Sequence, residues 1–374
     1  MQKLGYVNAL RGLAILGVIM VHANLYGHSS LPHVMQLIIE KGQSGVQLFF
    51  LASAFTLFRS FKLRSITEAS PTRNFFFRRF FRIAPMYYAG ILFYVIQNRI
   101  GFIASPETTE HFTAANIISN FTFLHGFNPY WMSSIVPGGW SIAIEMTFYA
   151  LLPFLFSRIK TINHAFYFFI ISVFLRIFFH LILLKFPLIS FESLWTEYLF
   201  LYFPSQLPLF ALGIIMYFLI FENKAANVFS GKALLISSGL LLAILSIDFI
   251  PTQIVFGVAF LILGVALSKY NFRGIVNPLI EFIGKISFSM YLVHFAVFQW
   301  LTNLNFIDYS SNGIVDYAAR FIIGLALTVI ISSVTYYLIE IPFQNLGKKL
   351  IDKMEKRQLL KVAVLILPVN EAVL

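Results

Sequence analysis

Two residues of the segment 6–25 could do chemistry on one helix face. This segment, YVNALRGLAILGVIMVHANL, is mostly apolar, yet it holds Arg11 and His22. In an α-helix, residues eleven apart lie within about 20° of each other around the axis and about 16.5 Å apart along it. The guanidinium could bind an anion, and the imidazole could act as a general base. The alternative is that Arg11 extends to the lipid headgroups and His22 lies in the membrane interface.

A carboxylate in the segment 139–157 could orient that imidazole. Glu145 lies well inside the stretch VPGGWSIAIEMTFYALLPF, at a depth comparable with that of His22. A carboxylate beside a histidine fixes its tautomer and raises its basicity, as a general base requires. The alternative is that Glu145 caps a neighbouring helix or bonds a serine. Ionisable groups at this depth are usually functional.

Three arginines come at the start of the segment 80–98. The stretch NFFFRRFFRIAPMYY contains Arg78, Arg79 and Arg82. Arg79 and Arg82 are three residues apart, so they share a helix face. Guanidinium groups bind phosphates through two parallel hydrogen bonds, and with Arg11 at the same membrane level the cluster predicts a site for a polyanionic, nucleotide-bearing cofactor. Topology alone also places arginines at a cytoplasmic helix end, so an anchoring role stays open.

The segment 285–303 carries a further set of polar side chains. In IGKISFSMYLVHFAVF, Ser287, Tyr291 and His294 follow the i, i+4, i+7 spacing of one helix face. This pattern indicates a hydrated interior surface, although a lone histidine there is more often a structural hydrogen-bonding group. Trp140, near the start of the segment 139–157, could anchor its helix in the membrane interface or stack on a sugar ring.

Several chemistries have no support in the sequence. The chain has no Cys, so it has no disulfide, no thiolate nucleophile and no Cys-ligated metal. His22 and His294 lie in different segments, and no H-E-x-x-H spacing occurs, so no metal site is expected. A hydrolase-like serine nucleophile is not expected either, because no G-x-S-x-G motif is present.

Composition shows which elements must position these residues. Of 374 residues, 59% are hydrophobic and 11% charged, with a mean hydropathy of +0.80, whereas soluble domains carry about 25% charged residues. Apolar runs long enough to cross a bilayer recur along the chain. We therefore predict an all-α, polytopic integral membrane bundle whose partner is the lipid bilayer. The net charge of +11 is not taken as a sign of nucleic acid binding, because in membrane proteins the distribution of charge matters more.

Ten membrane spans are predicted, with both termini in the cytoplasm. They lie at 6–25, 44–60, 80–98, 139–157, 164–184, 198–221, 232–249, 252–268, 285–303 and 315–338. In this orientation the inner segments hold 21 of the 27 Lys and Arg residues and the outer loops hold three. This asymmetry follows the positive-inside rule and predicts that both termini lie in the cytoplasm. The longest outer loop, 99–138, is a candidate functional loop.

Two parts of the chain are distinguished. Residues 1–347 form the predicted transmembrane domain, and 348–374 form a basic, then apolar, cytoplasmic tail.

Six motifs in order resemble acyltransferase family 3, bacterial membrane O-acetyltransferases of lipopolysaccharide O-antigen and other surface glycans. They are the Arg11–His22 pair, GVQLFFLASAF from Gly45 to Phe55, the Arg79–Arg82 element followed by Pro85, WSIAIEMTFYALLP from Trp140, ISFSMYLVHF, and the ending YYLIEIPFQNL. The chain departs from the family pattern at Gln47, where Asp is usual, and at Ala52 and Ala54 around Ser53. These departures put in question whether its acceptor selectivity is that of its relatives.

The resemblance implies a bacterial inner (cytoplasmic) membrane protein, an activity and roles for the site. This sequence shows no periplasmic hydrolase-like domain of the kind fused to some members of the family, so we expect transfer directly to an acceptor or hand-over to a separate periplasmic transferase. Acetyl-CoA would be the acyl donor, its phosphates held at the cytoplasmic face by Arg79 and Arg82, with Arg11 and Arg78 nearby. His22 would remove the proton from an acceptor hydroxyl or receive the acyl group, and Glu145 would orient it. The implied residues on the acceptor side are Trp140, Ser141, Tyr291 and His294. The competing interpretation is a transporter or flippase of a glycan-related substrate, which predicts internal repeats that the sequence lacks.

Overall fold

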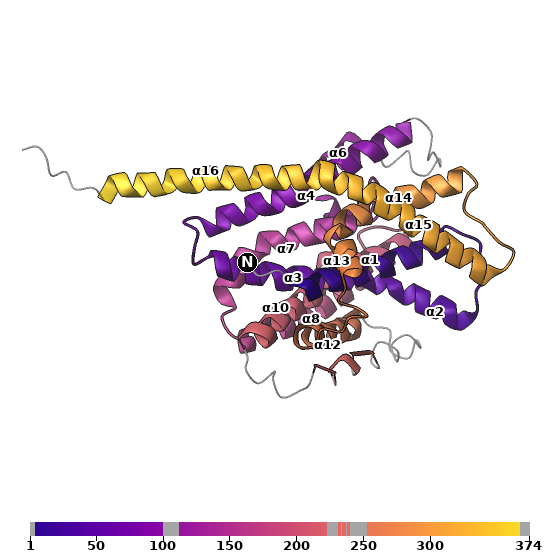
Figure 1. The fold of residues 1–374 in the computed structure, drawn as a ribbon, viewed down its shortest axis with the longest axis horizontal. Helices are drawn as coiled ribbons and strands as arrows, with labels where there is room; N and C mark the ends of the chain where they lie inside the picture. The colour runs from indigo at the N-terminus through magenta and orange to yellow at the C-terminus, as the bar shows by residue number, and fades with distance from the viewer. Residues whose placement is uncertain are drawn as a thin grey trace, which may run out of the picture.

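The computed structural model describes residues 4–99, 112–222, 231–232, 234–236, 238–239 and 253–366. The regular elements in this part of the chain are all helices, as the apolar pattern predicts. Figure 1 shows the longer helices gathered side by side in one bundle, from which α16 projects. The longer helices are α1 (Gly5–Leu25), α3 (Gly45–Arg64), α4 (Pro71–Arg99), α7 (Gly139–Arg158), α8 (Ile162–Lys185), α10 (Phe203–Phe221), α15 (Gly313–Thr335) and α16 (Ile341–Ile366).

Shorter helices connect and complete the bundle. They are α2 (His33–Lys41), α6 (Ala114–Phe121), α9 (Glu192–Leu201), α12 (Gln253–Lys269), α13 (Pro278–Lys285) and α14 (Ser287–Asn303), with 3₁₀ turns at Gly42–Ser44 and His125–Phe127. A π-helical stretch, Tyr336–Glu340, joins α15 to α16, so the predicted domain boundary at residue 347 falls inside α16.

Within the described residues, six helices are long and apolar enough to cross a membrane, and seven if the bent pair α13–α14 is one span. These helices support a membrane protein, while the count of ten and the cytoplasmic termini stay predictions. The structure differs from the predicted spans in two places: α12 is a shorter apolar helix, and α4 is long but interrupted by arginines and tyrosines. The predicted span 232–249 falls mostly outside the described residues.

The helix α1 lies at the centre of the bundle, in contact with α3, α13, α14 and α15. Two glycines of its neighbours let the backbones touch it. A Cβ at Gly284 of α13 would overlap the Asn8 carbonyl, and one at Gly45 of α3 would overlap the Ala14 carbonyl. Small residues at such crossings are the usual means of close helix packing in membranes. The position of α1 is therefore fixed from at least two sides.

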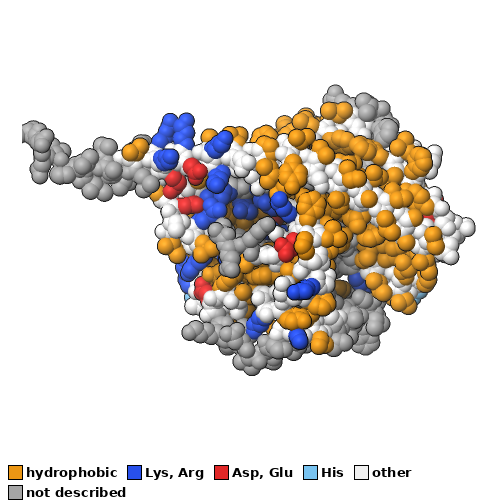
Figure 2. Space-filling model, in the orientation of Figure 1, with side chains coloured by type: hydrophobic (Ala, Val, Ile, Leu, Met, Phe, Trp, Pro, Cys, Tyr) orange, Lys and Arg blue, Asp and Glu red, His pale blue; other side chains and the backbone are white. Residues whose placement is uncertain are grey.

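Polar and apolar surfaces separate along the bundle. Figure 2 shows Lys and Arg gathered toward the side from which α16 projects, and hydrophobic side chains over much of the remaining visible face. The basic end, as we name it, holds Arg11, Arg79 and Arg82. The helix α8 exposes most of its apolar side chains, as expected for a lipid-facing helix.

Candidate active site

The cavity richest in predicted site residues lies at the basic end between α1, α3, α4, α7 and α14. It measures about 70 Å³. We call it the arginine cavity and define it by its polar lining: Arg11, Ser53, Arg79, Arg82, Ser141, Glu145, Tyr149, Ser287 and Tyr291. Phenylalanines of α3 and α14 complete the wall. The cavity thus unites six of the ten residues predicted from the sequence.

The three arginines of this cavity form no ion pair with any described residue. Arg11 donates to the Thr56 hydroxyl at 3.0 Å. The guanidinium of Arg79 lies 5.9 and 6.0 Å from the ring centroids of Phe75 and Tyr149, and its buried Nε has no hydrogen-bond partner. A second hollow, lined by the same three arginines together with Asn8, Arg59 and Ser60, adjoins the cavity. Because enclosed cations are normally paired, this arrangement is typical of a site for an anion.

Glu145 is the carboxylate of the arginine cavity. It accepts hydrogen bonds from the Ser53 hydroxyl and from the Tyr149 hydroxyl, the latter at 2.5 Å. No hydrogen bond or ion pair joins Glu145 to His22 in the described residues, so the predicted pairing is replaced by the alternative of a bonded serine. The reason is position along α7: Glu145 lies almost two turns beyond Gly139, where the helix starts, and so reaches the level of the arginines.

Arg78 is directed away from the arginine cavity. Both of its terminal nitrogens bind Glu68, at 2.9 and 2.8 Å, and Glu68 also accepts from Arg64 and Asn74. Burial raises the pKa of Glu68, but the hydrogen bonds from Arg78 and Asn74 outweigh burial and hold that pKa below its ordinary value. Consecutive helical residues point about 100° apart, which explains why Arg78 and Arg79 serve different clusters.

His22 and His294 form a pair, with ring centroids 4.9 Å apart. Each Nδ1 lies close to the carbonyl four residues earlier in its own helix, Val18 at 2.8 Å and Met290 at 3.0 Å. Because a carbonyl only accepts, each Nδ1 carries a proton, and each Nε2 is then the basic nitrogen. The Nε2 of His294 is buried without a partner. The geometry leaves two imidazole lone pairs available for proton transfer.

One face of α14 connects the arginine cavity to the histidine pair, as its i, i+4, i+7 spacing predicts. Ser287 and Tyr291 line the cavity, and the His294 ring lies 5.8 Å from the Tyr291 ring. The Tyr291 hydroxyl donates to the Gly138 carbonyl at 3.0 Å and accepts from Ser141 at 2.9 Å. His22 and His294 are not part of the lining, so Tyr291 stands between the cavity and the pair.

Trp140 lies outside the lining of the arginine cavity. Its ring packs against Phe50 with centroids 5.9 Å apart. The structure therefore gives Trp140 a packing contact and leaves its predicted contact with a sugar as a prediction. No group of three or more His, Asp or Glu side chains in the described residues is placed to hold a metal ion.

Comparison with known proteins decides the family. A family model described as an acyltransferase domain, Acyl_transf_3, matches residues 4–337, which is nearly the whole chain. The chain belongs to acyltransferase family 3. Curated relatives include a protein with the provisional name O-acetyltransferase from Staphylococcus aureus strain COL, 25% identical over 388 residues that cover 93% of this chain and 59% of the relative.

A second relative with the same provisional name, from Staphylococcus aureus strain MSSA476, is 25% identical over 386 residues, or 93% of this chain and 58% of that protein. This family 3 chain thus spans less than two thirds of the length of these relatives. No solved structure matches it significantly.

Two site residues were not among the predicted ones: Ser53 and Tyr149, both partners of Glu145. Tyr149 follows Glu145 by four residues, so the helical i, i+4 rule could have found it. Ser53 lies within the quoted family 3 motif, but only the packing of α3 against α7 reveals its partner.

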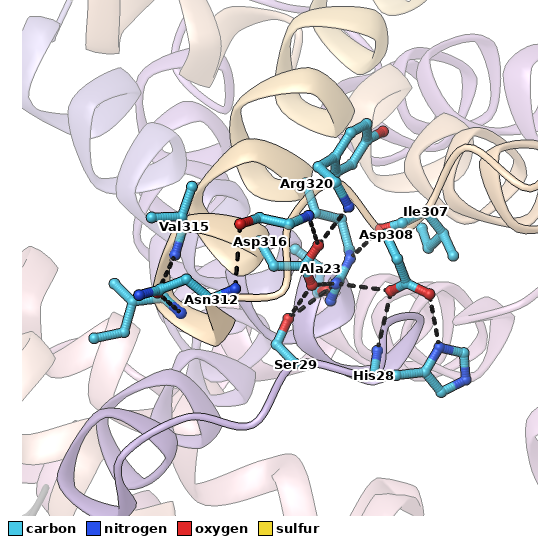
Figure 3. A network of polar contacts seen from close by, with 12 residues as sticks. Ala23, His28, Ser29, Ile307, Asp308, Asn312, Val315, Asp316 and Arg320 are labelled. Carbon is cyan, nitrogen blue, oxygen red and sulfur yellow. Dashed lines mark hydrogen bonds and ion pairs between the residues drawn. The ribbon is translucent and has the colours of Figure 1, made fainter.

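Figure 3 shows a further cluster, centred on Arg320 of α15. It contacts α1 at Ala23, twelve residues and so about 18 Å along the helix from Arg11. Arg320 is fully buried and donates to the carbonyls of Ile307 at 2.7 Å and Ala23 at 3.1 Å. It also donates to Ser29 and pairs with Asp308 and Asp316. Every nitrogen of the Arg320 guanidinium thus has a hydrogen-bond partner, and the cluster joins the end of α1 to α15.

Proposed function

We propose that this protein is a membrane O-acyltransferase that moves an acetyl group from acetyl-CoA to a hydroxyl of a cell-surface glycan or its lipid-linked precursor. The observation that carries the proposal is the arginine cavity, in which three cations without carboxylate partners face one enclosed space. Family 3 membership and the provisional names of the relatives support the class of reaction.

The arginine cavity would hold the anionic end of the donor. The lining holds three arginines and one carboxylate, that of Glu145, and a second carboxylate, Glu340, lies within electrostatic range of Arg82. The positive charge that remains suits a ligand with several phosphate charges. Acetyl-CoA supplies an acyl group activated as a thioester. The separation of Arg11 and His22 along α1, about 16.5 Å, is comparable to the reach of an extended pantetheine arm.

The histidine pair would perform the proton transfers. The Nε2 of His22 would take the proton from the acceptor hydroxyl while the hydroxyl oxygen bonds to the acyl carbon and the carbon–sulfur bond breaks. The proton then passes to the departing thiolate, so the imidazole ends neutral. General base catalysis of this kind is worth roughly 10²- to 10⁴-fold in rate. A covalent acyl-histidine is the other route that this geometry allows.

The positive-inside count supports a sidedness for these steps. With 21 of the 27 basic residues on the inner segments, the basic end would face the cytoplasm and the donor would enter there. The acceptor would approach His22 from the periplasmic side of the inner membrane, past the loop that precedes α7. A separate periplasmic transferase as the receiver is the alternative to direct transfer.

Transfer of labelled acetyl groups tests the proposal. In membranes from expressing cells, [¹⁴C]acetyl-CoA should label surface glycan, and His22→Ala should lower labelling at least about 100-fold. The control is His180→Ala, on the lipid-exposed helix α8, which should label as the parent does. Undiminished labelling by inserted His22→Ala would refute the role of His22, and glycan uptake without any labelling would support the transporter instead.

A further inference from the structure

A second cavity has no part in the mechanism above. It measures about 280 Å³ and lies between residues 129–134 and α9. We call it the outer pocket and define it by Tyr130, Ser133, Leu194, Glu197 and Tyr198. Trp195 of α9 donates to the Leu183 carbonyl at 3.0 Å, so the pocket lies beside the end of α8.

Fixed aromatic rings form one side of the outer pocket. The Tyr198 ring stacks on Trp195 with centroids 5.4 Å apart and planes 16° apart, and Tyr202 continues the stack at 5.7 Å. The hydrogen bond to Leu183 anchors this stack. Tyr130, from the facing segment, is 41% exposed. Rigid aromatic faces with polar tips suit a ligand that has both apolar C–H faces and hydroxyl groups.

Two polar side chains of the outer pocket have no hydrogen-bond partner among the described residues. Glu197 is exposed and forms no hydrogen bond or ion pair with any described residue, and the same is true of the Ser133 hydroxyl. No Lys or Arg lines the pocket. Arg176 of α8 lies within electrostatic range of Tyr202, which packs against Tyr198, but no cation lies beside Glu197 in the lining. A carboxylate in that position repels phosphates and other anions, while it accepts hydrogen bonds from hydroxyl or amino groups. These features favour a neutral or amino sugar over a lipid headgroup.

The outer pocket lies within reach of the histidine pair. Ser134 at its rim lies four positions before Gly138, whose carbonyl accepts a hydrogen bond from Tyr291 beside His294. That stretch of chain spans at most about 14 Å. A chain of a few sugar rings could therefore occupy the pocket while another of its rings reaches the pair.

We propose that the outer pocket is a subsite for one sugar of the acceptor glycan, away from the hydroxyl that receives the acyl group. This proposal rests on the proposed function. It predicts that the protein recognises the acceptor as a chain: Tyr198 and Glu197 hold one unit while His22 acts on another.

The length of the acceptor tests the subsite. Fragments of one and three repeats, released from the host's own surface glycan, are compared as acetyl acceptors with the purified full chain. The three-repeat fragment should have a KM roughly tenfold lower. In Tyr198→Ala and Glu197→Gln, the KM for the one-repeat fragment divided by the KM for the three-repeat fragment should fall toward one. Thr196→Ala, on the same helix outside the pocket, is the control and should keep the parental ratio.

Three outcomes would overturn the proposal. The parent protein could have equal KM values for the one-repeat and three-repeat fragments, or both variants could keep the parental tenfold difference between these KM values. The third outcome is a co-purified lipid that is released by Tyr198→Ala. Binding of the three-repeat fragment without acetyl-CoA, measured by calorimetry in the His22→Ala background, separates the two proposals. If no fragment is ever acetylated but this binding persists and is lost on adding Tyr198→Ala, the proposed reaction fails while the sugar subsite stands.

Discussion

The arginine cavity and the Arg320 cluster solve the problem of an enclosed cation in opposite ways. Arg320 is fully buried, and its guanidinium meets two carboxylates, two carbonyls and a hydroxyl. The arginines of the cavity have between them one hydroxyl partner and aromatic neighbours. The two carboxylates near them, Glu145 in the lining and Glu340 within electrostatic range of Arg82, are bonded to serine hydroxyls. One region therefore has its charge compensated, and the other has a surplus.

This contrast separates a structural arginine from a ligand-binding one. An enclosed charge costs free energy unless it is paired, so the satisfied cluster stabilises the fold. On the proposed function, the arginines of the cavity would gain their partner when the anionic donor binds. Substitution of Arg320 should therefore lower the folding stability, and substitution of an arginine in the cavity should weaken donor binding.

The largest effect is expected at Arg320. Arg320→Met leaves Asp316 enclosed without its cation, and breaking a buried pair in this way costs about 3–5 kcal/mol of folding free energy. Thermal unfolding in detergent should show a large loss of Tm, while the KM for acetyl-CoA of the folded fraction stays at the parental value. A normal Tm would show that the cluster does not stabilise the bundle.

The next effect is expected in the arginine cavity. Arg79→Gln removes a charge-assisted contact to the donor, worth about 1.5–3 kcal/mol, so the KM for acetyl-CoA should rise roughly ten- to a hundredfold. The Tm should hold or rise, because repulsion among the arginines falls. Arg158→Gln, an exposed cation at the same end, is the matched control. Equal KM values for the two variants would contradict the assignment of the cavity to the donor.

The smallest effect is expected at Glu68. Its carboxylate is paired, as the Arg320 guanidinium is, but it is partly exposed to solvent. Its pKa is held below the ordinary value of 4.5, so the stabilisation is present above that value and is lost as the pH falls through the lowered pKa. Glu68→Gln should cost about 0.5–1 kcal/mol at pH 7 and flatten the fall in Tm at acidic pH. Parallel Tm profiles of parent and variant would contradict this.

Much of the fold and part of the site follow from local sequence patterns. Apolar runs predict a helical membrane bundle, and spacing within one helix predicts the polar face of α14. The grouping of Arg79 and Arg82 with Arg11 follows from charges at the same helix level. In each case the relevant geometry lies within one helix or depends on depth alone.

The remainder depends on which helices are neighbours, which sequence spacing does not state. Glu145 could have met any helix at its depth, and packing of α3 on α7 selects Ser53. Arg78 belongs to another cluster because the loop before α4 presents Glu68. Asp316 precedes Arg320 by one helical turn, so local spacing could have indicated that pair. Ala23 and Ser29 lie nearly 300 residues away in sequence, and no local pattern could have indicated them.

The uninterrupted helix α1 carries Arg11 at one end and His22 at the other, and its backbone is clamped at Asn8 and Ala14 by Gly284 and Gly45. The two functional ends therefore cannot move independently: their separation is built into a stiff rod. On the proposed function, a substrate would be admitted by movement of α4, α7 or α14 around α1, since these helices also line the arginine cavity. On the proposed function, the fixed separation of Arg11 and His22 would select donors whose anionic end and acyl group are the same distance apart.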